Sequence, residues 1–263
     1  MTAPAGESSA GSVRRIDVLG VGISAIDPDD ALAEITRWLT DGIRHYVCVT
    51  GVHGVMEAQR DPELLRIHND SGLTTPDGMP LVWAARFAGA ANVRRVYGPD
   101  LMLAVCERAA ERAWASFLYG STDDVLERLR RNLCDRFPGL RIVGAFSPPF
   151  RELTDDEDDA VIQAINESGA QIVWVGLSTP KQERWMAAHI GRIDAAVLIG
   201  VGAAFDVHAG EVRQAPKWMQ RSGLEWLFRL ASEPRRLWRR YAINIPRFLI
   251  AIARRPPRLR SRR

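Results

Sequence analysis

Residues 175–186, with the sequence VGLSTPKQERWM, join an apolar strand to a helix start that carries an unusual lysine. Thr179 can cap this helix, Pro180 suits the first helical position, and Gln182 follows the threonine at the spacing of a capping box. Lys181 does not fit the same account, because the positive end of the helix dipole disfavours a cation in the first turn. A bound anion would offset this repulsion. The stretch therefore predicts either a simple capped helix or part of an anion site.

A second candidate is Asp77, which stands in a Pro-Asp-Gly turn before the apolar run MPLVWAARF. The aspartate can serve as a turn former or helix cap. A carboxylate at the end of a strand can also take a proton from an attacking hydroxyl group. Arg94 and Arg95 precede the next turn, and a guanidinium group matches the oxygens of a diphosphate as a bidentate fork. For both segments the structural and the chemical interpretation remain open.

Two glycine-rich segments add a different alternative. GVGISA fits the G-x-G-x-x-A pattern of nicotinamide dinucleotide sites with Gly20, Gly22 and Ala25, which suggests an oxidoreductase. The helix after these glycines is expected to begin only at Asp27, and no acidic residue closes the next strand, so the usual context of the pattern is missing. The second segment, GVGAAFDVHAGEVRQAP, places small residues where a ligand can approach the backbone. Its binding candidates are Gly202 and Asp206.

The alternation of apolar runs with helical patterns predicts the fold class. Expected strands cover residues 15–21, 45–50, 115–119, 141–145, 171–177 and 195–201. Their nearly continuous apolar character is typical of strands buried on both faces. Asp27, Asp61 and Thr154 are expected to cap helices, the last in a capping box. We therefore predict an α/β protein with a doubly wound, mostly parallel sheet, whose ligands bind beyond the carboxyl ends of the strands.

The C-terminal end of the chain is strongly basic. The net charge of the 263 residues is +3, but the last 29 hold 11 arginines and no acidic residue, so the remainder carries a net charge of −8. From about residue 211 the sequence mixes Trp, Phe, Leu and Arg at helical spacing, and Pro234 and Pro246 are expected to break it into short helices. Such a segment is typical of an amphipathic helix pair docked on the body, or of an interfacial membrane anchor. A module that binds phosphate, including nucleic acid, is a further alternative.

We expect three parts: a disordered leader at residues 1–13, an α/β domain at 14–210 and a basic amphipathic appendage at 211–263. No apolar run reaches the roughly 18 residues of a membrane-spanning helix. The histidines show no metal-binding spacing, so no metal and no cofactor are predicted. The three cysteines are widely spaced, which favours a reducing compartment over disulfides. The candidate membrane-binding residues are Arg221, Arg229, Arg235, Arg236, Arg239 and Arg240.

Taken together, several stretches resemble the successive motifs of the WecG/TagA/CpsF glycosyltransferases. They are TPDGMPLVWAAR, RRVYGPDLM, FLYGS, VGLSTPKQERW and GVGAAFDVHAGEVRQAPKWMQRSGLEWLFRLASEPRR, and the resemblance covers about residues 18–248. It implies a Rossmann-like catalytic domain with a C-terminal helical appendage that completes the active site and holds the enzyme to the membrane. It also implies no metal requirement, and a peripheral location on the cytoplasmic face of a bacterial plasma membrane.

The activity implied by the resemblance is transfer of a sugar, typically N-acetylmannosamine, from a UDP-sugar to a polyprenyl-diphosphate-linked sugar, with inversion at the anomeric carbon. The implied partners are this donor, this acceptor and an anionic membrane surface, without nucleic acid; a homo-oligomer remains open. The products would enter teichoic-acid-type or other surface polysaccharides. By the resemblance, Asp77 is the catalytic base, Thr50 a pocket residue and Arg95 a diphosphate contact. Gln182 lies beside the donor with Lys181 and Glu183, and Asp206 lies at the nucleoside end.

The chain departs from the family pattern at two strand ends. His53 follows Thr50 in the segment Gly51-Val52-His53, where relatives often carry an asparagine, and is expected to substitute for it. After the strand at residues 141–145, the segment SPPF replaces a Gly-Tyr-Phe-like stretch and makes Phe150 a binding candidate. Donors bind at strand ends in such sheets, so both changes leave the sugar open between N-acetylmannosamine and another hexose.

Overall fold

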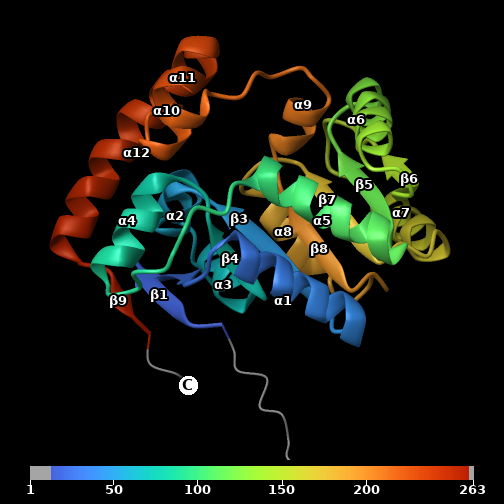
Figure 1. Ribbon diagram of the computed structural model, residues 1–263, viewed down its shortest axis with the longest axis horizontal. Helices are drawn as coiled ribbons and strands as arrows, with labels where there is room; N and C mark the ends of the chain where they lie inside the picture. The colour runs from blue at the N-terminus through green and yellow to red at the C-terminus, as the bar shows by residue number, and fades with distance from the viewer. Residues whose placement is uncertain (1–12, 261–263) are drawn as a thin grey trace, which may run out of the picture.

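The computed structural model describes residues 13–260 and shows a parallel sheet with helices on both faces (Figure 1). Apart from its last residue, the expected leader at residues 1–13 lies outside this range. The six strands follow the order β4-β3-β8-β7-β5-β6, and all of their pairs are parallel. They are β3 (His45–Thr50), β4 (Leu73–Pro76), β5 (Ala115–Gly120), β6 (Arg141–Phe146), β7 (Ile172–Gly176) and β8 (Val197–Gly200).

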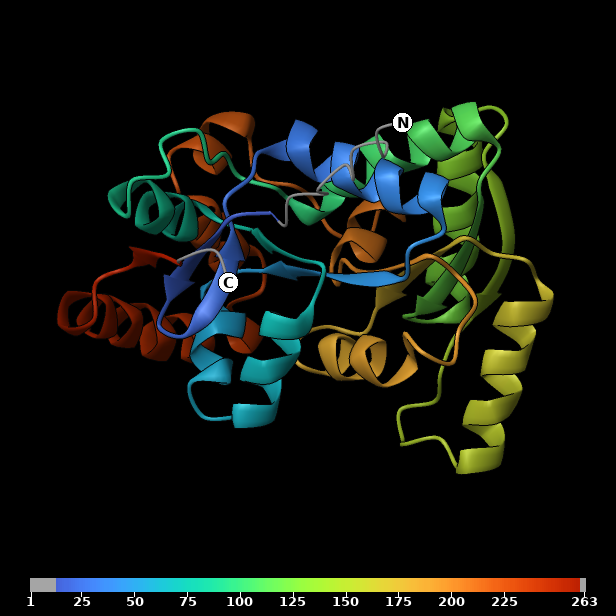
Figure 2. The same ribbon diagram turned by 90° about the horizontal axis from the view of Figure 1, so that it is seen from below.

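Two groups of helices bury the opposite faces of this sheet, which Figure 2 shows from below. One apolar cluster joins the strands to α1 (Pro28–Asp41), α5 (Gly98–Arg112), α6 (Asp123–Arg136) and α9 (Ala204–His208). The other cluster joins them to α3 (Pro62–Asp70), α7 (Asp155–Glu167) and α8 (Lys181–His189). Because both faces are covered, the strands read as continuous apolar runs. The predicted doubly wound α/β fold is confirmed.

The expected helix starts are largely confirmed. The Asp27 side chain accepts hydrogen bonds from the backbone amides of Asp29 and Asp30 and caps α1. Asp61 caps α3 in the same way, and Thr154 opens α7 with a complete capping box. Side-chain oxygens at these positions satisfy amide groups that have no partner inside the helix.

The first expected strand, at residues 15–21, was wrong in its placement. It is an antiparallel hairpin of β1 (Arg15–Val18) and β2 (Val21–Ser24), outside the parallel sheet. Leu19 and Gly20 both have positive φ angles, of 55° and 91°, so the chain reverses there in a two-residue turn. The glycines of the GVG pattern therefore belong to a hairpin and not to a strand-to-helix turn that could hold a pyrophosphate.

The sixth parallel strand, β4, was missed. Its sequence LTTP has two threonines and a proline, so it lacks the continuous apolar run by which the other strands were predicted. Thr74 is nevertheless fully buried, because its hydroxyl donates to the His68 carbonyl oxygen at 2.7 Å. Buried polar groups with such partners carry little desolvation cost. The strand pairs with β3, so its end lies beside the end of β3.

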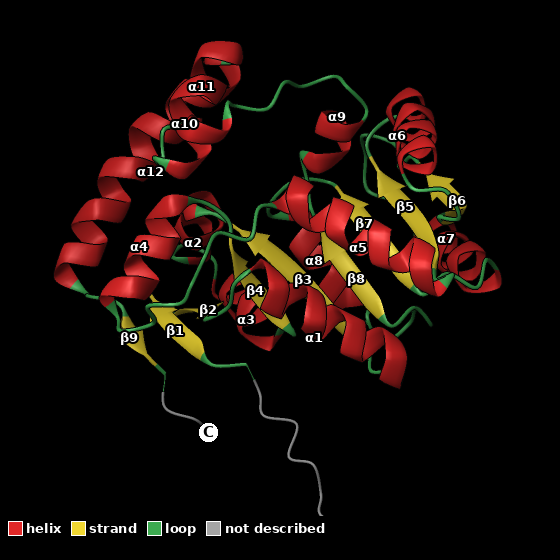
Figure 3. Cartoon of the chain, viewed as in Figure 1, coloured by secondary structure: helices red, strands yellow, loops and turns green. Residues whose placement is uncertain are grey.

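The C-terminal appendage consists of α10 (Lys217–Arg221), α11 (Glu225–Ser232) and α12 (Pro234–Arg254), drawn at the upper left of Figure 3. Pro234 begins α12 as expected, but Pro246 lies inside a helix that continues past it, so the predicted break was wrong. The appendage packs on the body through α2 (Val52–Ala58), and Phe248 joins the apolar cluster of the hairpin and α4 (Met79–Phe87).

After α12, the chain runs back to the N-terminal hairpin. Strand β9 (Arg258–Leu259) pairs antiparallel with β1, so α12 is attached to the body at its C-terminal end as well. The guanidinium of Arg260 donates to the Gly20 carbonyl oxygen at 2.6 Å. A Cβ atom at position 22 would lie 2.6 Å from Nη1 of this guanidinium, so the Arg260 side chain would have to shift to make room for it. Within residues 13–260, no helix is long and apolar enough to cross a membrane.

Candidate active site

A cavity of about 250 Å³ opens beyond the carboxyl ends of β3, β4 and β8, and the appendage forms its far wall. The body contributes the loops after these strands and the segment between α9 and α10. Residues 14–210 contribute Val49, Gly51, His53, Asp77, Arg95, Tyr97, Thr179, Gln182, Gly202 and Ala203 to its lining; Arg213 follows them in the segment before α10, and α10–α12 contribute Gln220, Glu225, Trp226, Arg229, Tyr241 and Asn244. The predicted location of the site, at the strand ends, is thus the place where the structure has a cavity.

Asp77 enters this cavity directly after β4. Its backbone amide donates to the Thr50 carbonyl oxygen at 2.8 Å, which extends the pairing of β3 and β4 by one residue. Gly78 follows with a φ of 112°, and this turn starts α4. The helix has Gly78 as its N-cap residue and no side-chain cap, so the alternative interpretation of Asp77 as a helix cap is wrong.

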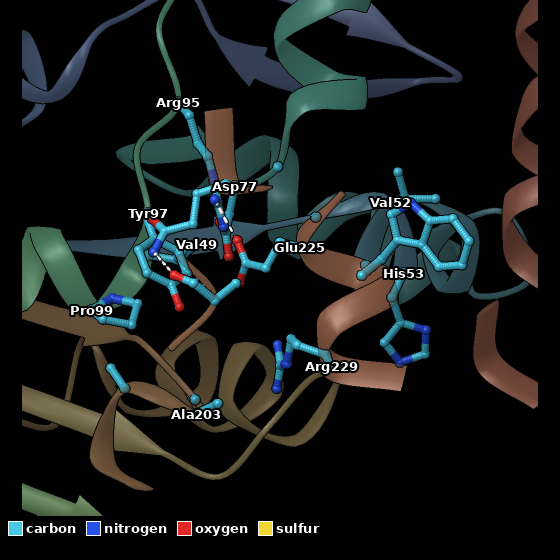
Figure 4. A pocket seen from close by; sticks show the side chains of 18 of the residues that line it. Val49, Val52, His53, Asp77, Arg95, Tyr97, Pro99, Ala203, Glu225 and Arg229 are labelled. Atoms are coloured by element: carbon cyan, nitrogen blue, oxygen red, sulfur yellow. Dashed lines mark hydrogen bonds and ion pairs between the residues drawn. The ribbon is translucent and has the colours of Figure 1, made fainter. Parts of the chain in front are cut away.

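Arg95 holds the carboxylate of Asp77 from the side (Figure 4). Its Nε and Nη2 atoms donate to Asp77 Oδ1 at 3.2 and 3.0 Å. Its Nη1 lies 2.5 Å from Oε2 of Glu225, which comes from α11 of the appendage. The guanidinium also lies 4.1 Å from the ring centre of Tyr97. Arg95 therefore contacts two carboxylates and a ring here, and its expected contact with a diphosphate remains a prediction.

The charges around Arg95 stabilise its ionised form. Burial acts to lower the pKa of Arg95, but the carboxylates of Asp77 and Glu225 outweigh this effect and raise it. Burial also raises the pKa of Tyr97, and the negative charges of Glu225 and Asp77 act in the same direction. The Tyr97 phenol thus stays protonated at neutral pH. Arg94 plays no part in this group, since it pairs with Asp27 and Asp29 at the surface.

The segment after β7 is arranged differently from the expectation. α8 begins at Lys181 with Pro180 as its N-cap residue, so Thr179 stands too far from the helix to cap it, and the expected capping box was wrong. The Thr179 hydroxyl instead donates to Glu183 Oε1 at 2.8 Å. Gln182 Nε2 donates to the same oxygen at 3.2 Å. Glu183 is completely buried, and it therefore orients two residues that line the cavity.

The remaining binding candidates divide into two groups. His53 and Gly202 line the cavity, and His53 Nδ1 lies 3.2 Å from Nδ2 of Asn244 on α12. Lys181 is exposed outside the lining, and Asp206 on α9 is not part of it either. Phe150 is 99% exposed after β6, at the sheet edge farthest from β4. The expected contacts of Lys181, Asp206 and Phe150 with a substrate have no support from this arrangement.

Among the candidate membrane-binding residues, Arg229 occupies an unexpected position. It lines the cavity one helical turn after Glu225, while Arg221, Arg235 and Arg239 are exposed. The side chains of two further candidates, Arg236 and Arg240, lie outside the described residues. Glu225 was not among the predicted site residues, and Arg229 was predicted at the membrane, although their spacing of four residues places both on one face of a helix. In the described part of the chain, no group of three or more His, Cys, Asp or Glu could hold a metal ion.

Comparison with known proteins tests the assignment. A sequence model described as the Glycosyl transferase WecG/TagA/CpsF family matches residues 16–262. The chain belongs to this family. Two relatives are each named N-acetylglucosaminyldiphosphoundecaprenol N-acetyl-beta-D-mannosaminyltransferase. The protein of Bacillus spizizenii is 30% identical over 203 residues, which cover 74% of each chain. The protein of Bacillus subtilis strain 168 is 29% identical over 195 residues, covering 74% of this chain and 73% of the relative.

The resemblance identified over residues 18–248 is thus confirmed, and the family match extends it through the basic tail to residue 262. As a WecG/TagA/CpsF glycosyl transferase, the chain is an enzyme that moves a sugar. The alternative of a nicotinamide-dependent oxidoreductase has no support from these relatives, and its glycines lie in the β1–β2 hairpin.

Behind the cavity wall of this transferase, Thr50 contacts a buried histidine. Thr50 is almost fully buried, and its Oγ1 lies 3.4 Å from Nδ1 of His68. The expected pocket threonine thus supports the wall from behind, since it is not part of the cavity lining. Burial lowers the pKa of His68 from 6.5 to about 4, and the charge of Arg15 acts in the same direction. His68 is therefore neutral in the folded protein at neutral pH.

This neutral histidine predicts a loss of stability in mild acid. Because its pKa is lower in the folded than in the unfolded chain, the unfolded chain takes up a proton first as the pH falls below 6.5. Between about pH 7.5 and about pH 5, His68 should lower the free energy of unfolding by about 2 kcal/mol. Urea unfolding at both pH values measures this loss. In His68→Gln, the free energy of unfolding should fall by about 2 kcal/mol less than in the wild type over this pH range. A fall as large as that of the wild type would contradict a neutral, buried His68.

Proposed function

We propose that the chain transfers N-acetylmannosamine from a UDP-activated donor to the sugar of a prenyl-diphosphate-linked N-acetylglucosamine. The names of the two relatives support this choice of sugar and acceptor. The observation that carries the proposal is the position of Asp77 at the end of β4, where its carboxylate borders the cavity. Both hydrogen bonds that Arg95 donates to Asp77 go to Oδ1. Among the described residues, none donates a hydrogen bond to Oδ2 of Asp77. One carboxylate oxygen is therefore available to accept a proton.

The reaction follows from this arrangement. A hydroxyl oxygen of the acceptor attacks the anomeric carbon of the donor as the bond from that carbon to the diphosphate oxygen breaks. The hydroxyl proton passes to Asp77, and UDP leaves with the bonding electrons. A single displacement of this kind inverts the anomeric configuration. Asp77 acts as general base, a function that typically contributes about 10²- to 10⁴-fold to the rate.

The departing diphosphate needs positive charge nearby, because negative charge develops on it as the bond breaks. Arg213, from the loop between α9 and α10, and Arg229, from the appendage, both line the cavity. Arg95 is already paired with two carboxylates, so we assign the diphosphate to Arg213 and Arg229 in the first place. Gln182, in the first turn of α8, and Gly202, just after β8, border the same space and suit the rest of the donor.

The acceptor is lipid-linked, and the appendage is suited to meet a membrane surface. Its exposed arginines stand among exposed aromatic and aliphatic side chains, the composition of a helix that lies at a lipid interface. We propose that α10–α12 rest on the anionic inner face of the plasma membrane and place the cavity near the acceptor. The exposed large apolar residues of these helices are Trp226, Leu227, Trp218, Trp238, Ile243, Leu249 and Ile250.

A transfer assay with several donors tests the proposal. The enzyme is offered UDP-N-acetylmannosamine, UDP-N-acetylglucosamine, UDP-glucose or UDP-glucuronate, each with a short prenyl-diphosphate-linked N-acetylglucosamine. We expect transfer from UDP-N-acetylmannosamine in preference to the other three. Preferred transfer from another donor would overturn the choice of sugar. Absence of transfer from all four donors, with no binding of UDP in a calorimetric titration, would overturn the proposed site.

A further inference from the structure

Glu225 is the one acidic side chain that the appendage contributes to the described cavity lining. It is the first residue of α11, and its side chain is only 12% exposed. Its Oε2 lies 2.5 Å from Nη1 of Arg95, whose opposite edge holds Asp77. The Arg95 guanidinium therefore joins a carboxylate of the body to a carboxylate of the appendage (Figure 4).

The contacts of Arg95 restrict it in three directions. Asp77 binds the edge formed by Nε and Nη2, Glu225 binds Nη1, and the ring of Tyr97 lies against the guanidinium. Arg95 has a long side chain with several rotatable bonds, and its side chain is 14% exposed. Without Glu225, the Nη1 end would lose its ionic partner, and the guanidinium could turn away from Asp77. Removal of one partner of a buried charge pair leaves the other charge uncompensated, whereas exposed pairs contribute little.

We propose that Glu225 is a positioning residue for sugar transfer. It acts from the appendage through Arg95 and holds the Asp77 carboxylate in the orientation in which it accepts the proton. The inference rests on the proposed function of Asp77 as general base. Through Glu225, the appendage takes part in proton transfer, in addition to its proposed contacts with the membrane and with the diphosphate. A small misplacement of a reacting group can cost about a hundredfold in rate, so the effect should be measurable.

The test replaces Glu225 with glutamine, which keeps the shape and removes the charge. We expect kcat to fall about tenfold to a hundredfold, with the KM for the donor nearly unchanged. Glu225→Asp keeps the charge and should recover part of the lost rate. Glu233→Gln is the matched control, because Glu233 follows the same helix outside the cavity lining, and this variant should keep the wild-type kcat. A rise in KM with unchanged kcat would overturn the inference, since it would indicate direct contact with substrate.

A double-mutant cycle separates positioning from other effects. If Glu225 acts only through Asp77, Glu225→Gln should change the residual rate of Asp77→Asn by less than about twofold. The same loss in both backgrounds would overturn the inference while leaving the proposed function intact. Full activity of Asp77→Asn alone would overturn the proposed function itself. If Glu225→Gln does not fold, the same cycle is run with Glu225→Asp. An equal loss of rate in the wild type and in Asp77→Asn would then overturn the inference.

Discussion

Replacing Asp77 with asparagine is expected to lower kcat by about 10²- to 10⁴-fold, the usual contribution of a general base. The amide has nearly the same shape, and its oxygen can still accept hydrogen bonds from Arg95. It cannot take up the proton of the acceptor hydroxyl. Since the proposed diphosphate contacts lie elsewhere, affinity for UDP should be unchanged. Initial rates of sugar transfer and calorimetric titration with UDP measure the two effects separately.

Asp100→Asn is the matched control for this variant. Asp100 is an exposed aspartate on α5 that pairs with Lys217 and does not line the cavity. Its replacement removes the same charge at the surface and should leave kcat unchanged. Wild-type activity in Asp77→Asn would mean that Asp77 only forms the turn between β4 and α4.

Replacing Arg95 with alanine should destabilise the protein as well as inactivate it. The variant leaves the carboxylates of Asp77 and Glu225 close together without the positive charge between them. Removing one partner of a buried ion pair typically costs about 3–5 kcal/mol, because an unpaired charge remains inside. We expect the lower end of this range, because the Asp77 side chain is 28% exposed. Urea unfolding followed by tryptophan fluorescence gives the free energy of unfolding.

The neighbouring residue supplies the comparison. Arg94→Ala removes an arginine that forms exposed ion pairs with Asp27 and Asp29, and such pairs contribute about 0–1 kcal/mol. Arg94→Ala should therefore be nearly as stable as the wild type. If the two variants lose the same stability, Arg95 does not hold the two carboxylates together.

Much of the fold could be predicted from the sequence because burial on both faces leaves a clear pattern. The expected strand at residues 45–50 coincides with β3, and the other four central strands were found with small differences at their ends. The exceptions have local causes. β4 carries two buried threonines in place of apolar residues, and of these Thr74 donates its hydroxyl to the His68 carbonyl oxygen. Residues 15–21 contain a turn whose only mark is Leu19-Gly20. β9 has only two residues, Arg258 and Leu259, and it forms because β1 offers it an edge.

The candidate site was predictable where it depends on the end of a strand. Asp77 and Gly202 follow β4 and β8, and the parallel sheet brings both to one cavity. Lys181 illustrates the limit of local reasoning, because a position in the first turn of a helix does not define the side toward which a lysine extends. Glu225 and Arg229 illustrate another limit. Their spacing places them on one face of α11, but only the docking of the appendage decides that this face meets Arg95.

Sugar transfer with Asp77 as base is a single displacement at the anomeric carbon, so the stereochemistry of the product decides whether it takes place. The donor UDP-N-acetylmannosamine carries an α-linked diphosphate. Nuclear magnetic resonance of the disaccharide first formed on the prenyl-diphosphate acceptor reports the new anomeric configuration. We expect a β linkage, the inverted configuration. An α linkage would contradict it, because retention of configuration requires a second displacement or a different mechanism, neither of which assigns Asp77 the function of a base.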